Sequence, residues 1–110
     1  MARFEGDRLT LAAADNYRIA VKTITMLDSV EESSVVVPAR ALNELGRILA
    51  DVDDPIEVML APARNQIVFH LDDARIDLVS RLIDGQFPNY QQVIPASHAT
   101  RAVFDREELL

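Results

Sequence analysis

Apolar residues recur at every second position in the first quarter of the chain. They lie on both sides of Asp15-Asn16, a pair that readily adopts turn conformations. A period of two is typical of a strand with one buried face, so the pattern predicts a β-hairpin over residues 6–24. A polar connection at 26–33 and a short strand at 34–37 are expected to follow. The alternating residues are Leu9, Leu11 and Ala13 before the turn, and Tyr17, Ile19 and Val21 after it.

From Pro38 the hydrophobic period changes to that of a helix. Apolar and polar side chains then separate onto two faces, which predicts an amphipathic helix from Pro38 to Asp51 with Pro38 in its first turn. The apolar face holds Leu42, Leu45, Ile48, Leu49 and Val52, and the polar face holds Arg40, Asn43, Glu44 and Arg47. The stretch DVDDP ends the helix.

The second half returns to alternation and predicts an antiparallel meander of three strands with one apolar face. Its turns are expected at residues 62–65 and at Asp72-Asp73. Residues 99–104 predict a further short strand, and Asp105 followed by Glu108 predicts the start of a helix. The meander's apolar positions are Ile56, Val58 and Leu60, then Ile67, Phe69 and Leu71, then Ile76, Leu78 and Leu82. The fold class is therefore α+β.

The bulk properties fit one compact domain of 110 residues that is expected to be soluble and cytoplasmic. The chain has no cysteine, and its N-terminus lacks the apolar core of a signal peptide. Its net charge of −7 opposes non-specific attraction to nucleic acid, so any contact with phosphate has to be local. The chain stops one turn into its last predicted helix, as if it were part of something longer.

The sequence gives little support for an enzyme. It contains no nucleophile elbow, no Walker A motif and no glycine-rich phosphate turn, and we expect no cofactor and no metal. His70 and His98 lie 28 residues apart without a ligand pattern, and a cross-strand pair is the better interpretation of His70. Asp51, Asp53 and Asp54 lack the glycine and distal glutamate of a calcium loop.

Two features leave alternatives open. Arg40 and Arg47 are two helical turns apart and so point the same way about 10 Å apart, which suits phosphates. Glu44 lies between them, however, and the residues alone favour an ordinary solvated face. Tyr17, beside a turn, is either rim packing or an anchor for a peptide, and packing is the better interpretation of it alone.

Three motifs together resemble the middle domain of the bacterial sliding clamp, the beta subunit of DNA polymerase III. They are AADNYRIAV at 13–21, VVVPARALNEL at 35–45 and LIDGQFPNYQQVIP at 82–95, in that order. The resemblance implies the DNA clamp fold, with one βαβββ unit and flanking strands. It also implies that residues 1–95 are part of the middle domain and that residues 96–110 begin the third.

The resemblance further implies a non-catalytic processivity factor in DNA replication. Such clamps are homodimeric rings around duplex DNA, with helices lining the hole. The residues implied to face DNA are Arg40, Asn43 and Arg47, of which Asn43 and Arg47 follow from helical spacing. A pocket between the middle and third domains captures linear motifs of polymerase, clamp loader and repair proteins. The residues implied for its middle-domain wall are Ala14, Asn16, Tyr17, Arg18, Ile19, Pro88, Gln92 and Val93.

The chain departs from the family pattern at the polar rim of this pocket. The chain has Asn16 where the family usually has a glycine, Tyr17 where it has a histidine, Ala14 where it has a threonine and Gln92 where it has an arginine. Pro88 resembles a rigid pocket wall, whereas Phe87 and Tyr90 have the simpler interpretation of plugging the sheet edge. The alternative to a clamp is a freestanding acidic module that binds proteins and never encircles DNA.

Overall fold

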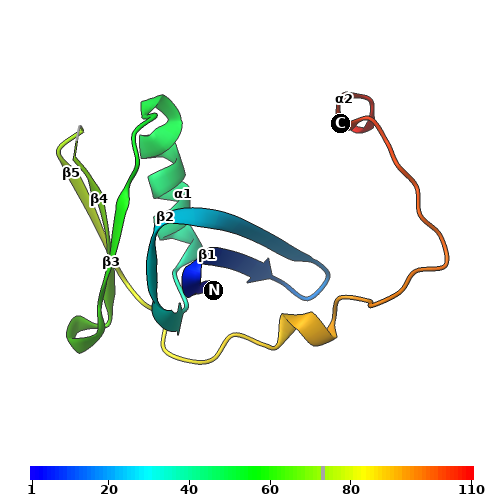
Figure 1. Cartoon of the computed structure of the whole chain (residues 1–110), viewed down its shortest axis with the longest axis horizontal. Coiled ribbons are helices and arrows are strands. Elements are labelled where there is room, and N and C mark those ends of the chain that lie inside the picture. Colours follow the sequence, from blue (N-terminus) through cyan, green and yellow to red (C-terminus); the bar gives the residue numbers. More distant parts are fainter. Residues whose placement is uncertain (73) are drawn as a thin grey trace.

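The computed structural model describes residues 1–72 and 74–110 and divides them between two antiparallel sheets and one main helix (Figure 1). The first sheet pairs β1 (Ala2–Ala14) with β2 (Ile19–Val35), and the second has the order β3-β4-β5. The remaining elements are α1 (Ala39–Ile48), η1 (Leu49–Asp51), β3 (Glu57–Ala61), η2 (Pro62–Arg64), β4 (Gln66–Leu71), β5 (Ile76–Arg81), η3 (Tyr90–Gln92) and α2 (Arg106–Leu109). The predicted α+β class is confirmed.

The hairpin is longer than the alternation predicts. Its second strand runs without a break from Ile19 to Val35, so the predicted polar connection at 26–33 and separate strand at 34–37 are wrong. The reason is the N-terminal segment: Ala2 pairs with Val35 and Gly6 with Val30. Ladder hydrogen bonds join backbones whatever the side chains, so a polar segment becomes a strand where a partner is present. Gly6, with φ of 60°, lies at the irregularity in this ladder.

Helix α1 packs its apolar face between the sheets, as the periodicity predicts. Leu45 is buried, and Leu42, Ile48 and Leu49 pack against the same core. Pro38 is the N-cap rather than part of the first turn: its ψ of 135° is extended, and helical geometry begins at Ala39. The buried core cluster consists of Ala2, Phe4, Val37, Leu45, Ile67, Phe69 and Leu71.

The three-stranded meander is confirmed, with β4 at its centre. Ile67, Phe69 and Leu71 are buried, while the residues between them face outward. Asn65 closes the β3–β4 connection in the left-handed region at φ 51°, ψ 47°, a conformation that asparagine tolerates better than most residues. The turn predicted at Asp72-Asp73 includes residue 73 and lies outside the described residues.

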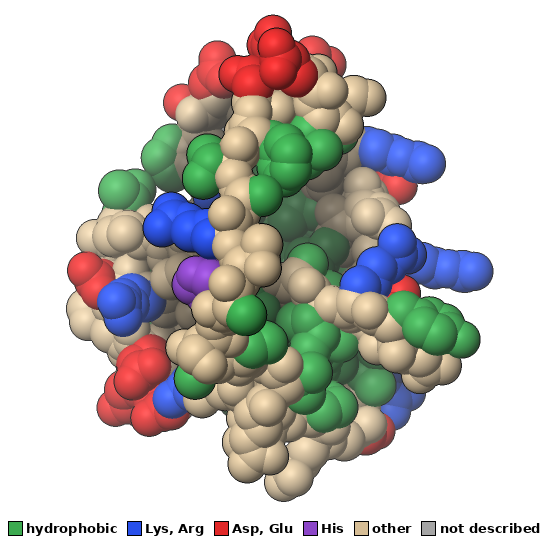
Figure 2. Space-filling view, turned by 90° about the vertical axis from the view of Figure 1, so that its right-hand side faces the viewer, with side chains coloured by type: hydrophobic (Ala, Val, Ile, Leu, Met, Phe, Trp, Pro, Cys, Tyr) green, Lys and Arg blue, Asp and Glu red, His purple; other side chains and the backbone are tan. Residues whose placement is uncertain are grey.

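The last quarter of the chain leaves the body (Figure 1). The predicted strand at 99–104 is wrong, because this segment is irregular and exposed. The Cα radius of gyration is 16.2 Å, against about 13 Å for a compact chain of this length. Figure 2 views the molecule from the side to which this segment extends and shows hydrophobic side chains exposed there.

The start of a helix predicted near the C-terminus is confirmed at its cap. Asp105 accepts hydrogen bonds from the backbone N–H groups of Glu107 and Glu108, and α2 follows. Among the described residues, none of the helices has the length and apolar character needed to cross a membrane.

Candidate functional site

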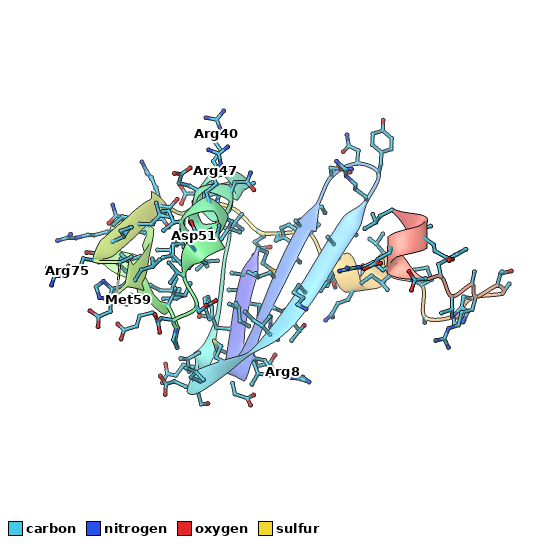
Figure 3. All side chains as sticks on the ribbon, turned by 90° about the horizontal axis from the view of Figure 1, so that it is seen from above. Arg8, Arg40, Arg47, Asp51, Met59 and Arg75 are labelled. Atoms are coloured by element: carbon cyan, nitrogen blue, oxygen red, sulfur yellow. The ribbon has the colours of Figure 1, made fainter. Side chains whose placement is uncertain are left out.

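The outward face of α1 carries the residues predicted to face DNA. Arg40, Asn43 and Arg47 are all exposed. Figure 3 shows Arg40 and Arg47 projecting from the helix to the same side of the molecule. Arg47 Nη1 lies 3.6 Å from Glu44 Oε2, whereas Arg40 forms no ion pair within the part of the chain that the structure describes. The helix therefore presents two guanidinium groups to solvent, one of them shared with Glu44, and an amide between them.

The turn between β1 and β2 is held in shape by one carboxylate. Asp15 Oδ1 accepts from the backbone N–H groups of Tyr17 at 2.8 Å and Arg18 at 3.0 Å. Asp15 Oδ2 accepts from Arg18 Nε at 2.9 Å. The Tyr17 amide, followed by the hydrogen bonds from Arg18, lowers the pKa of Asp15 below its usual value. The turn is thus pre-organised, and Tyr17 projects from it with 95% of its surface exposed. Rim packing within this chain is therefore not its role.

A shallow apolar pocket of about 290 Å³ lies at the base of this turn. Three of the predicted pocket residues, Ala14, Arg18 and Ile19, line it together. Asn16 and Tyr17 do not line it. Ala14 and Ile19 are direct register partners, as are Ala13 and Ala20. The hollow forms because small alanine side chains here leave space that a larger residue would fill. The complete lining is Ala13, Ala14, Asp15, Arg18, Ile19 and Ala20.

A second, larger groove of about 390 Å³ adjoins the first and shares three of its alanines. It runs between the hairpin and the start of α1, and its lining includes Val37, Ala39 and Leu42. Phe87, in the segment after β5, also lines this groove. Sequence reasoning gave Phe87 only a packing role, yet it is the residue through which this segment reaches the hairpin. The apolar pattern of residues 35–42 gave no signal for a groove, because the same pattern describes a buried helix face.

The other predicted residues of this segment lie elsewhere. Pro88, Gln92 and Val93 line neither hollow, and Val93 is 66% exposed. The Phe87 and Tyr90 rings pack edge to face with centroids 6.2 Å apart. The structure therefore brings together one half of the predicted pocket and leaves its Pro88–Val93 half as a separate exposed surface.

The segment that carries Phe87 is anchored where it leaves β5. The Leu82 amide donates to Asn65 O at 2.8 Å, and the Ile83 amide donates to Val36 O at 2.8 Å. Asn65 Nδ2 donates to Asp84 Oδ1 at 2.8 Å and to Leu82 O at 3.3 Å. Gly85 then turns the chain at φ 128°, a backbone conformation that side-chain-bearing residues avoid.

His70 lies on the sheet face away from α1. Its Nδ1 is 2.5 Å from Asp77 Oδ1, and the two residues are register partners, which confirms the predicted cross-strand pair. The hydrogen bond to Asp77, with smaller contributions from Asp77, Glu57 and Asp72 charges, raises the pKa of His70 above its usual value. Within residues 1–72 and 74–110, no cluster of three His, Cys, Asp or Glu side chains could hold a metal ion.

An α+β chain with this helix face and this hairpin pocket has the architecture of a DNA clamp domain. Residues 1–89 match the family of the DNA polymerase III beta subunit, central domain, and the chain belongs to this family. The similarity covers most of the chain and includes both the hairpin and α1.

Individual relatives agree with the family match. The chain is 31% identical over 94 residues to the beta sliding clamp of Staphylococcus epidermidis, covering 86% of this chain and 24% of that one. The Staphylococcus aureus beta sliding clamp is 28% identical over 102 residues, covering 93% and 26%. The chain thus spans about a quarter of the length of these relatives.

Solved structures confirm the fold. A putative DNA polymerase III beta subunit from Eubacterium rectale superimposes with a TM-score of 0.76 at 27% identity, over 87% of this chain and 26% of that one. The DNA polymerase III subunit beta from Pseudomonas aeruginosa gives 0.76 at 26% identity, over 87% and 25%.

Proposed function

We propose that this chain is part of a DNA sliding clamp, a non-catalytic processivity factor whose intact form is a homodimeric ring around duplex DNA. Family membership supports the class, and the exposed polar face of α1 is the observation that carries the proposal. Residues 1–95 are then part of the middle domain, residues 96–110 begin the third, and the ring acts in the cytoplasm.

The role of α1 follows from the physics of a sliding grip. Contacts to phosphate hold DNA without reading its sequence, so a ring can move along the duplex. Arg40 and Arg47 offer two cations on one side of a rigid helix, and Asn43 between them adds neutral hydrogen-bonding groups. The whole chain has a net charge of −7 although α1 carries more basic than acidic residues, so the negative charge lies on the rest of the surface, which repels DNA and confines contact to the lining.

The salt dependence of DNA binding tests this role in the intact ring. Replacing Arg40 and Arg47 together by alanine is expected to reduce the slope of log affinity against log salt by about 4, since two phosphate contacts are lost in each of the two subunits of the ring. Arg8→Ala is the matched control, because Figure 3 places Arg8 on the opposite side of the molecule from α1's arginines. An unchanged slope in the double variant would refute the assignment of this face.

The hollow at the hairpin supports the second half of the proposal, the capture of linear motifs from polymerase, clamp loader and repair proteins. Its apolar floor around Ile19, beside a turn fixed by Asp15, is a surface that needs little reorganisation when a flexible peptide binds. Pro88, Gln92 and Val93 are proposed to complete this site once the third domain stands beside it.

A peptide that carries a clamp-binding motif, titrated against the intact ring, tests the pocket. Ile19→Asp places a charge on the apolar floor and is expected to weaken binding about tenfold or more. Ile24→Asp is the control, since Ile24 lies on the same strand, is 41% exposed and lines neither hollow. Equal affinities in both variants would favour the alternative, an acidic protein-interaction module that binds elsewhere and does not encircle DNA.

A further inference from the structure

The sheet β3-β4-β5 has one face covered by the body and one that is not. Figure 1 shows this sheet nearly edge-on, with α1 on one side and no described segment of the chain over the other. We call the uncovered side the outer sheet face. Met59 is 46% and Val79 is 52% exposed on it. Its members are Glu57, Met59, Ala61, Gln66, Val68, His70, Asp77, Val79 and Arg81.

The strand register arranges these side chains in three parallel rows. Glu57, His70 and Asp77 form an acidic row at one end of the strands. Met59, Val68 and Val79 form an apolar row across the middle. Ala61, Gln66 and Arg81 form a row at the other end whose only charge is positive. The outer sheet face is therefore an apolar stripe between a negative and a positive border.

The charged residues just beyond the acidic row do not change the charge difference between the two borders. Asp72 and Arg75 lie in the connection between β4 and β5, just beyond the acidic row, and their charges are opposite. At the other border, Arg81 forms no ion pair within the described residues, and its side chain is exposed. The charge difference between the two borders of the face thus comes from Glu57 and Asp77 at the negative border and Arg81 at the positive border.

We infer that the outer sheet face binds the same face of a second copy of this chain. A two-fold axis along the apolar row stacks that row on itself and places each copy's acidic row over the other's basic row. Asp77 then meets Arg81 of the second copy, twice per dimer. A two-fold axis along the strands would instead place Glu57 over Asp77, and like charges repel, so the charge pattern selects the first arrangement.

The size of the face sets the strength of this association. Three strands about 4.8 Å apart and five or six residues long present a patch of about 14 by 18 Å. This is well below the roughly 800 Å² per partner that a stable complex buries. The association is therefore weak and transient, and it leaves the helix face and the hairpin pocket of the proposed clamp free.

Sedimentation velocity of the full chain over a concentration series up to about 1 mM tests the inference. The sedimentation coefficient of the wild type is expected to rise with concentration. Asp77→Arg and Arg81→Asp are each expected to lose this rise, because each variant opposes like charges across the interface. A 1:1 mixture of the two variants is expected to regain it. In the mixed dimer the two exchanged side chains face each other with opposite charges, and the native Asp77–Arg81 pair forms at the second position.

Arg101→Asp in the exposed C-terminal segment changes the net charge as Arg81→Asp does and is expected to associate like the wild type. Circular dichroism verifies that each variant keeps its fold. Asp77→Arg could unfold because it loses the hydrogen bond to His70. In that case the concentration dependence of the sedimentation coefficient is compared between Arg81→Asp and Arg101→Asp, and this comparison alone tests the inference. A wild type that stays monomeric, an Arg81→Asp variant that associates like the wild type, or a mixture of folded variants that fails to associate would each overturn the inference.

Discussion

The body of the molecule, residues 1–83, and the tail, residues 84–110, differ in what their backbone and apolar groups contact. Residues 26–33 of the body are largely polar, yet they lie in a strand because the N-terminal strand runs beside them. Residues 99–104 of the tail are more apolar, and yet they form no ladder within the described residues. Strand formation here follows the presence of a partner strand more closely than side-chain hydrophobicity.

Apolar side chains show the same contrast. Phe69 in the body is 5% exposed, whereas Phe104 in the tail is 66% exposed and Leu110 is 98% exposed. Burial of apolar surface is the main stabilising term in folding, and residues 99–110 of the tail gain almost none of it within this chain. If residues 96–110 begin the third domain, as proposed, these side chains are the ones that would become covered there.

The largest expected difference between the two regions is in the cost of removing a phenylalanine ring. Phe69→Ala is expected to lower the free energy of unfolding by about 3–5 kcal/mol, because it leaves a cavity in the core. Phe104→Ala is its control and is expected to change it by less than about 0.5 kcal/mol. Urea unfolding followed by circular dichroism measures both. Similar losses in the two variants would show that the tail packs on the body.

A smaller effect is expected at the junction of body and tail. Asn65→Ala has two effects. It places alanine in a left-handed conformation, φ 51°, that alanine adopts less readily than asparagine, and it removes the side-chain hydrogen bonds to Leu82 and Asp84. The expected loss is about 2 kcal/mol, combining left-handed strain with a lost hydrogen bond. Asn65→Gly separates the two terms, since glycine relieves the strain alone. If both variants lose equally in urea unfolding, strain contributes nothing and the hydrogen bonds account for the whole effect.

The smallest effect is electrostatic and depends on pH. Because the bond to Asp77 raises the pKa of His70, folding gains stability from this pair that is fully present below the unfolded histidine pKa and is lost as pH rises through the folded pKa. NMR titration of Asp77→Asn is expected to show the pKa of His70 shifting down towards its usual value, with a flatter dependence of the urea midpoint on pH.

Asp105→Asn in the tail is the control for this pH effect. Asp105 accepts hydrogen bonds from the backbone of its own turn and is not among the residues that act on His70, so its replacement is expected to leave the pH dependence of the urea midpoint unchanged over the range in which histidine titrates. A wild-type His70 that titrates at the ordinary histidine pKa would contradict the role given to Asp77.

Much of the fold is readable from local periodicity. The helix over Leu42, Leu45 and Ile48 and the meander centred on Phe69 follow directly from spacings of 3.6 and 2. The cross-strand role of His70 also followed, since an isolated histidine on a strand finds its partner on the neighbouring one. The length of β2 did not follow, because its pairing with Ala2–Gly6 joins residues about 30 positions apart.

The candidate site divides in the same way. The exposure of Arg40 and Arg47 follows from the helical period, and the turn at Asp15 follows from residue type. The hollows do not follow, because they depend on which alanines oppose each other across the ladder and on where Phe87 comes to rest. Pro88 and Val93, assigned by resemblance, stay outside both hollows in this chain.

The sequence by itself determined the amphipathic helix and the three-stranded meander, which face of each is apolar, and to which family the motifs point. These are properties of short windows, where sterics and side-chain spacing act between near neighbours. Only the tertiary structure decided where strands end, which apolar side chains are covered, and which of the predicted pocket residues meet. Those outcomes require two distant segments to come together, and the free energy of their contact depends on both segments and cannot be predicted from either one alone.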